Sequence, residues 1–355
     1  MGKLMKLGTV VVALVAALAL VASTASGAHR QTSASPPAGP KQLSAAAWNA
    51  MVAKAKQEGR VTIYTIGAPT GYQAVAAKFK ELYGISVTVN RQVDNTLLAQ
   101  INAEETTGKA VADVWVAAAK PLVLGALQHK WVTDAVGPNF FAKRYDRSKL
   151  LIGKAWITGS SLLGVAWNTQ AVPGGVKDLT DFLKPEFKGK LSIPDPRISP
   201  ANVDWYNWVK ATYGAGFLGK LAAQNPKVYG SSLTATQAVA SGEIIGATQS
   251  AGSAAVSLKA AGAPVGYGLP NHGNAWNAGN IGMILRQAPH PAAAQVLANF
   301  LISPEGQALA QAGLGALYPN VPGTFYSPPR VARANDLSPA KVSAFITEWS
   351  KLFLH

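Results

Sequence analysis

The sequence predicts an α/β protein made of two halves, each a sheet of mostly parallel strands covered by helices. Its 355 residues are too many for one small domain and suit two. Strand-like and helix-like segments alternate along the chain, an order typical of parallel sheets. The stretch Leu191–Gly214 shows this order in one place, as a short apolar strand, a proline-rich loop and a helix.

The first half opens with a helix from about Ser44 to Gly59, because apolar residues recur there at helical spacing. Three apolar strands and two helices then alternate, each helix ending at a glycine. Ligands gather at the carboxyl ends of parallel strands, so the residues at those ends are candidate contacts. The strands are expected at 61–67, 85–91 and 112–118, and the helices at 72–83 and 95–107.

Two segments are expected to join the halves. Residues 155–169 are interpreted as a pair of strands that turn at Gly159, Ser160 and Ser161. Residues 271–280 are interpreted as a polar loop before a strand that begins at residue 281. A chain that crosses twice between two halves leaves a cleft between them, and such clefts are favoured ligand sites.

The helix of Leu191–Gly214 has strong start signals. Ser199 can accept a backbone N–H as the N-cap, and Pro200 has no N–H to leave unpaired. A helix N-terminus fed by a strand attracts anions, and Arg197 in the loop strengthens that expectation. Further helices are expected over 178–190, 216–224, 231–242, 253–261 and 290–313 and at the end of the chain, with strands over 243–250 and 264–270.

The N-terminus has the pattern of a secretory signal peptide. Lys3 and Lys6 precede the apolar run Val10–Val21, and small residues follow. The run is shorter than the ~20 residues that span a bilayer. Cleavage after Ala25 or Ala28 fits equally well.

Residues 1–28 are therefore expected to be a signal peptide for the general secretory route, and residues 29–40 a disordered leader. The chain has no Cys, which excludes disulfides, thiolate metal sites and a lipid-modified N-terminal Cys. We expect a soluble protein in the periplasm, or else one released to the medium or wall.

The net charge of +15 does not indicate nucleic-acid binding, because the basic residues are dispersed and do not alternate with aromatic residues. The densest basic cluster, residues 143–149, is interrupted by Asp146. His129, His272 and His290 lack zinc-site spacing. The S-x-x-K match at Ser338 lies in the tail, and the 17 carboxylates suggest no catalytic pair. No catalytic residue, metal or cofactor is predicted.

Five segments, in matching order from about residue 41 to the end, resemble the extracellular solute-binding proteins of ABC importers. The resemblance is to the branch with ferric-iron and 2-aminoethylphosphonate receptors. The segments read WNAMVAKAKQEGRVTIYT, KGKLSIPDPRISPAN, TATQAVASGEIIGA, HPAAAQVLANFLISPEGQALA and EWSKLF.

This resemblance implies a two-lobe Venus-flytrap, or type II periplasmic binding protein, with mostly parallel sheets and a two-crossing hinge. Lobe 1 would comprise residues 41–158 plus 276–325, and lobe 2 residues 159–275 plus 326–355. It also implies a monomer that binds a small ligand without chemistry and delivers it to a membrane permease and its ATPase.

The resemblance implies ligand contacts as well. Ser199 and Asn202 would donate hydrogen bonds and Arg197 would supply the counter-charge, unless Asp195 pairs with Arg197. The full set of implied ligand residues is Tyr64, Thr65, Trp115, Ser160, Ser161, Arg197, Ser199, Asn202, Gln249, Asn274 and Trp276.

Many ferric-iron members carry two adjacent tyrosines after the strand that here ends at Gln249, and this chain has no Tyr-Tyr pair. That departure argues against bare ferric ion and leaves a chelated metal, an oxyanion or an organic ligand. The alternative to a solute receptor is a secreted α/β hydrolase or a protein that binds wall or polyanion.

Overall fold

A computed structural model describes residues 42–270, 276–326 and 337–354, except for the side chains of Asn277, Ala278 and Phe325. The chain divides into two compact units, residues 1–39 and 40–355, and the second is described below. The expected signal peptide and leader lie outside the described residues. None of the helices in the described ranges has the length and apolar character needed to cross a bilayer.

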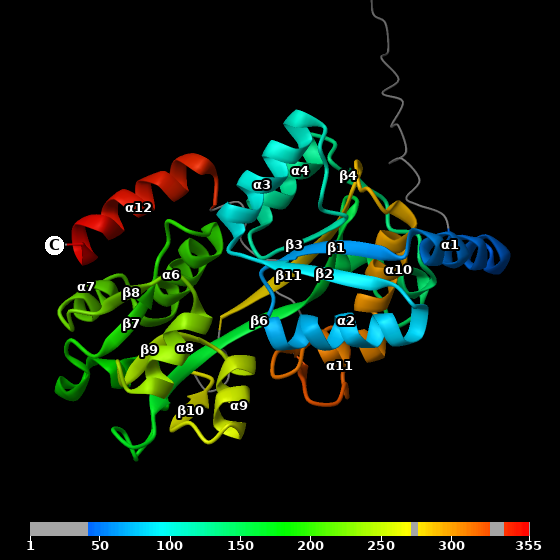
Figure 1. Cartoon of the computed structure of the whole chain (residues 1–355). Coiled ribbons are helices and arrows are strands. Elements are labelled where there is room, and N and C mark those ends of the chain that lie inside the picture. Colours follow the sequence, from blue (N-terminus) through cyan, green and yellow to red (C-terminus); the bar gives the residue numbers. More distant parts are fainter. Residues whose placement is uncertain (1–41, 271–275, 327–336, 355) are drawn as a thin grey trace, which may run out of the picture. The chain divides into compact units, whose positions relative to one another are not determined.

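The first lobe is built on a parallel trio of strands, as the sequence predicts. β1 pairs with β2 on one side and β3 on the other, both in parallel register. Figure 1 shows α2 and α11 below these strands and α3 and α4 above them. The elements are α1 (Ala45–Glu58), β1 (Arg60–Thr65), α2 (Pro69–Tyr83), β2 (Ser86–Arg91), α3 (Asp94–Thr107), β3 (Val114–Ala117), α4 (Lys120–Gln128), β4 (Val132–Thr133), α5 (Arg147–Leu150) and β5 (Leu151–Ile152).

Helix starts follow the local chemistry that the sequence shows. Ser44 caps α1 by accepting the N–H of Ala47, and Gly59 ends the helix at a left-handed φ of 69°. α2 begins at Pro69, three residues earlier than expected, because proline fits the first turn.

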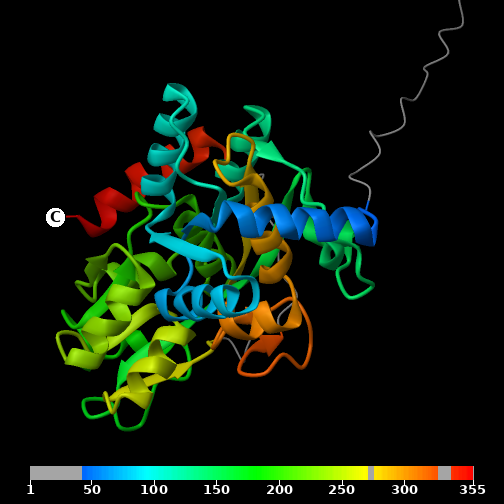
Figure 2. The ribbon, with the colours of Figure 1, turned by 45° about the vertical axis from the view of Figure 1, so that its right-hand side comes forward.

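The prediction of a turn at residues 159–161 is wrong. Residues Ala155–Asn168 form one strand, β6, which joins the two sheets. Its first part pairs antiparallel with β11 (Asn277–Leu285), and its last part pairs with β9 (Gly246–Ala251) and β10 (Val265–Gly268). Figure 1 shows β6 as one long strand between the two sets of helices, and Figure 2 shows these two sets from a second side. The expected loop over 271–280 is also too long, because Asn277 to Asn280 belong to β11.

The small residues of β6 make room for neighbours instead of turning the chain. A Cβ on Gly159 would stand 2.3 Å from Cδ of Gln311. A Cβ on Gly164 would stand 2.2 Å from the backbone oxygen of Gly268. Contacts this close exclude any side chain, so glycine here reflects close approach.

The second lobe has its own sheet, in which β7 runs parallel to both β8 and β9. Ser199 caps α6, Pro200 is its first residue and Gly214 ends it, as predicted. Ser231 caps α8 by accepting the backbone N–H of Thr234. The elements are β7 (Leu191–Pro194), α6 (Pro200–Tyr213), α7 (Phe217–Ala222), β8 (Lys227–Tyr229), α8 (Ser232–Ser241), β9 (Gly246–Ala251), α9 (Gly252–Ala260), β10 (Val265–Gly268) and α12 (Pro339–Phe353).

The expected helix over 178–190 is replaced by two short 3₁₀ turns, Leu179–Leu183 and Pro185–Phe187. The expected helical pair over 290–313 forms α10 (Pro291–Leu301) and α11 (Pro304–Ala310), with β12 (Gly315–Ala316) and β13 (Phe325–Tyr326) after it.

Apolar side chains pack into separate cores. One core draws on residues 55–157 and 281–321, around Phe79, Trp115 and Trp156. A second draws mainly on residues 165–353, where Tyr206 on α6 meets Trp349 on α12. Separate cores joined by two strands are the arrangement expected of two lobes that enclose a ligand.

Candidate ligand-binding site

Two adjoining cavities lie between the lobes. The larger has a volume of about 310 Å³ and the smaller about 110 Å³. Residues from the first lobe, the crossing strands and the second lobe line both. The shared lining residues are Ile66, Arg91, Ser161, Leu163 and Ser232.

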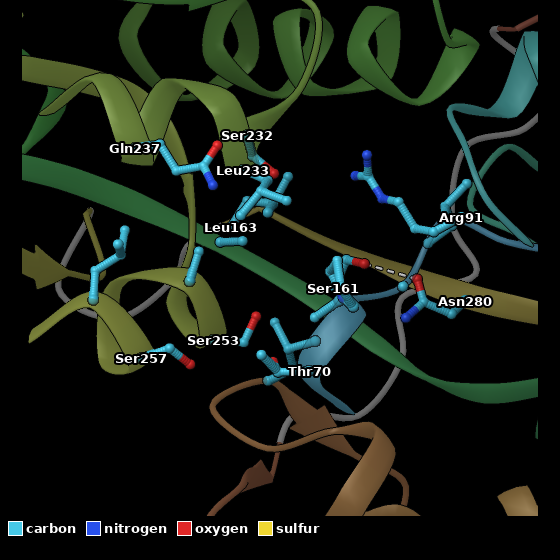
Figure 3. A pocket seen from close by; sticks show the side chains of 18 residues that line it. Thr70, Arg91, Ser161, Leu163, Ser232, Leu233, Gln237, Ser253, Ser257 and Asn280 are labelled. Carbon is cyan, nitrogen blue, oxygen red and sulfur yellow. Dashed lines mark hydrogen bonds between the residues drawn. The ribbon is translucent and has the colours of Figure 1, made fainter. Parts of the chain in front are cut away.

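Arg91 stands where the two cavities meet. It is the last residue of β2, and Figure 3 shows its guanidinium reaching into the space faced by Ser232 and Ser161. Nε is buried without a hydrogen-bond partner, and no Asp or Glu in the described ranges forms an ion pair with Arg91. Burial lowers the pKa of the guanidinium from its ordinary value. A partly buried cation without a counter-charge is a strong attractor for an anion.

Helix N-termini reinforce this positive field. α8 begins at Ser232 and α9 at Gly252, and residues of both first turns line the larger cavity. α2 presents Pro69 and Thr70 to the same cavity. Each N-terminus carries free N–H groups and a partial positive charge that favour an anion.

Ser253, in the first turn of α9, supplies a second unpaired polar group. The residue is 6% exposed, and its Oγ is buried without a hydrogen-bond partner among the described residues. An unpaired buried hydroxyl is costly, so it marks a place where a ligand oxygen would be stabilised.

The crossing strands contribute a fixed polar pair. Ser161 on β6 donates its hydroxyl to Oδ1 of Asn280 on β11, 2.7 Å away. Both residues line the larger cavity.

The smaller cavity contains the N-terminus of α6, where the sequence predicts an anion. The acidic group found at this N-terminus is a side chain of the protein itself, the carboxyl of Asp94. Oδ2 of Asp94, from the first lobe, accepts the Ser199 hydroxyl at 2.8 Å. Asp94 also accepts the backbone N–H groups of Ala118 and Ala119, at 3.2 and 3.1 Å. Burial nevertheless raises the pKa of Asp94 from its ordinary value.

Arg197 does not line either cavity. Its guanidinium donates to both carboxylate oxygens of Asp195, with Nη2 2.7 Å from Oδ2, and lies over the ring of Trp349. The pairing with Asp195 that the sequence left open is therefore present. Since Arg197 is already neutralised, the arrangement gives no support to its predicted role as the counter-charge.

Other predicted residues do line the smaller cavity. Asn202 donates to the backbone oxygen of Asp195 at 2.8 Å and accepts from Gln249 at 3.4 Å. Trp276 is 5% exposed and donates its indole N–H to Asp204 on α6. Asn274 lies outside the described residues. Ligand contact stays a prediction for Ser161, Ser199, Asn202, Gln249 and Trp276.

Four predicted residues lie away from both cavities. Tyr64 donates to Glu104 at 2.7 Å, and Thr65 accepts the N–H of Gly67 at 3.0 Å. Trp115 and Ser160 are fully buried. Successive side chains of a strand point to opposite faces, so a position at a strand end does not ensure that a side chain faces the cleft.

Sequence reasoning missed Arg91, Ser232, Gln237 and Ser253. Arg91 had a usable signal, because it ends the second strand of a parallel trio and ligands gather at such ends. The other three had weaker signals, since they lie on the helices α8 and α9 and the direction in which those helices face depends on the tertiary structure.

Neither cavity resembles a metal centre. No group of three or more His, Cys, Asp or Glu that could hold a metal ion occurs in the part of the chain that the structure describes. The S-x-x-K match is explained as a helix cap, since Ser338 accepts the N–H of Lys341 at the start of α12.

The geometry is that of an α/β protein of two lobes, with cavities between them that are lined by Arg91 and by helix N-termini. A model of the bacterial extracellular solute-binding proteins matches residues 74–334, and the chain belongs to this family. No curated protein matches the chain in sequence.

Solved structures of periplasmic binding proteins share the fold. A substrate-binding protein of an ABC transporter from Agrobacterium tumefaciens superposes with a TM-score of 0.71 at 16% identity, covering 85% of this chain and 97% of that one. AfuA from Actinobacillus pleuropneumoniae, solved with fructose-6-phosphate, gives 0.66 at 20%, covering 83% and 99%. Iron-bound HitA from Pseudomonas aeruginosa gives 0.64 at 19%, covering 83% and 99%.

Proposed function

We propose that this protein is the substrate-binding component of an ABC importer and captures a small anion between its lobes. The observation that carries the anionic assignment is Arg91, a cation at the junction of the two cavities that pairs with no acidic residue in the described part of the chain. An inward-facing guanidinium forms paired hydrogen bonds with carboxylate, phosphonate or phosphate oxygens. The resemblance to AfuA, which was solved with a sugar phosphate, agrees with this charge.

The two lobes would close over the ligand about β6 and β11. We place the lobes at residues 41–158 plus 276–325 and 159–275 plus 326–355. The two hydrophobic cores follow this division except that Ala119 and Trp276 pack in the second core. The closed protein would then dock on a membrane permease that works with an ATPase. Binding involves no turnover in this proposal, and the protein acts outside the cytoplasm after removal of residues 1–28.

A thermal-shift screen tests the function directly. Phosphonates, phosphate esters, sulfonates, carboxylates and ferric chelates would each be added to the purified mature chain. A ligand at a hundredfold excess over its Kd stabilises the folded state by about 2.7 kcal/mol. Stabilisation by at least one class of anion is expected. No stabilisation by any class, together with hydrolysis of a model ester, would overturn the proposal.

Charge-removing variants then test the site. Arg91→Gln should weaken binding of the anion found in the screen by about a hundredfold, since a buried charge pair loses one partner. Arg197→Gln removes the same charge from a residue that Asp195 already neutralises, and should change affinity less than about threefold. Arg286→Gln is the control for net charge, because Arg286 binds the backbone oxygen of Lys130 in the first lobe. Equal losses in all three variants would mean that only overall charge matters.

A further inference from the structure

Among its described lining residues, the larger cavity has ionisable charge of one sign only. Of the 18 described residues that line it, Arg91 is the one with an ionisable side chain. The N-termini of α8 and α9 add partial positive charge. A ligand ammonium group placed here would be desolvated without a carboxylate to pair with, which is strongly unfavourable.

The smaller cavity does not supply the missing carboxylate. Asp94 is its one described acidic lining residue. Both oxygens of Asp94 already accept hydrogen bonds, from two backbone N–H groups and from Ser199. An ammonium group would have to compete with these donors and with the partial positive charge of the α6 N-terminus.

The rest of the larger cavity suits an uncharged organic body. At about 310 Å³ it has the volume of roughly ten water molecules, far more than one metal ion requires. Aliphatic side chains from both lobes and β6 line it, and the unpaired hydroxyl of Ser253 interrupts this surface. The aliphatic lining residues are Ile66, Leu163, Leu233, Leu258 and Leu314.

We infer that the ligand is an organic anion with one anionic head, held by Arg91 and the start of α8, and an uncharged body. The body carries a hydroxyl or carbonyl oxygen that bonds to Ser253, and zwitterions with an ammonium group on the body are rejected. The inference rests on the proposed function and narrows its ligand class to non-zwitterionic, oxygen-bearing anions.

A grid of nine compounds tests this specificity by titration calorimetry on the mature chain. Each of three heads (phosphonate, sulfonate and carboxylate) is combined with three short bodies that end in methyl, hydroxymethyl or aminomethyl. For the head that binds, the hydroxyl compound should bind about threefold to tenfold more tightly than the methyl compound, as one added hydrogen bond predicts. The amino compound should bind at least about tenfold more weakly than the methyl compound.

Two variants assign these differences to residues. Ser253→Ala should remove the difference in affinity between the hydroxyl compound and the methyl compound. Gln237→Glu changes an amide that lines the cavity across from Arg91 into a carboxylate of the same shape (Figure 3). It should raise the affinity for the amino compound at least about tenfold relative to the methyl compound. Gln170→Glu, at an exposed position outside both cavities, should not.

The outcomes separate the two proposals. If no head binds, the proposed capture of a small anion is wrong. If a head binds and the amino compound binds as tightly as the others, anion capture stands and the rejection of zwitterions is wrong. If the hydroxyl compound has no advantage, or Ser253→Ala does not remove it, the assignment of Ser253 is wrong.

Discussion

Ser199 donates its hydroxyl to Asp94 at 2.8 Å, although the two residues are 105 positions apart and belong to different lobes. The neighbouring Asn95 adds two hydrogen bonds across the same boundary, to the backbone oxygens of Arg197 and Ile198. The start of α6 is therefore a contact between the lobes. Its positive end is satisfied by a carboxylate of the chain, while Arg91 lines both cavities and pairs with no described acid.

The first prediction concerns this contact. Ser199→Ala removes both the N-cap of α6 and one donor to Asp94, so it should lower the free energy of unfolding by about 2 kcal/mol. It should also change ligand affinity, because the residue lines the smaller cavity. Urea denaturation and calorimetry measure the two effects.

Ser303→Ala is the matched control for the cap. Ser303 caps α11 by accepting the N–H of Gly306, and it lies in neither cavity. This variant should lose about 1 kcal/mol and keep its ligand affinity. Identical behaviour of the two variants would show that the contact between Ser199 and Asp94 adds nothing beyond capping.

The second prediction concerns pH. Because burial raises the pKa of Asp94 in the folded state, the folded protein binds more protons than the unfolded chain just above the ordinary value of 3.8. Its contribution is therefore most favourable below that value and declines as pH rises through the raised folded pKa. The free energy of unfolding of the wild type minus that of Asp94→Asn should fall as the pH rises above the ordinary pKa of 3.8.

Asp146→Asn is the control, because the pKa of Asp146 is shifted in the opposite direction to that of Asp94. Hydrogen bonds from Ser148 and contact with Lys149 hold the pKa of this exposed carboxyl below its usual range. The free energy of unfolding of the wild type minus that of Asp146→Asn should be small and should not fall as pH rises. A difference for Asp94→Asn that increases with pH above 3.8 would contradict the assignment.

The third prediction concerns the close approach of the crossing strand to β10. In Gly164→Ala the new methyl group would meet the backbone oxygen of Gly268, so the variant should lose about 2–3 kcal/mol of stability or shift the strand register. Gly125→Ala in α4 has open space and should gain about 0.5–1 kcal/mol. Thermal unfolding of both variants checks the pair, and an unchanged melting midpoint in Gly164→Ala would disprove the contact.

The fourth prediction concerns metal. Since the described residues contain no cluster of His, Asp and Glu that could hold an ion, chelation should have no effect. The melting midpoint should be the same with and without EDTA, and free ferric ion should not raise it. A melting midpoint that falls in EDTA and recovers when iron is added would contradict this prediction and favour ferric ion as the ligand.

Much of the fold could be predicted because its signals are local. Three helices begin with a serine cap, whose hydroxyl accepts a backbone N–H two or three residues further along the chain. These caps are Ser44, Ser199 and Ser303. The parallel trio of strands follows from alternation of strand and helix. The turn predicted within β6 was wrong because glycine occurs both in turns and where two segments pack closely. The contacts with Gln311 and Gly268 show that close packing is the reason here.

The site could be predicted only in part, because its chemistry depends on charges that meet across the lobes. Arg91 and Arg197 both lie beside strand ends, and the sequence does not show which of them is neutralised by an acidic neighbour. The tertiary structure does so, because Asp195 neutralises Arg197 and no described acid neutralises Arg91.

The sequence by itself determined the alternating α/β halves, the capped start of α6 and the resemblance to solute-binding proteins. The first two rest on backbone hydrogen bonding and apolar periodicity over a few neighbouring residues, and the resemblance rests on five segments in matching order. Only the tertiary structure decided that Asp94 satisfies the α6 N-terminus and that Arg91 faces the cavities. The reason is that charge pairing and desolvation depend on which distant segments share a space from which water is excluded.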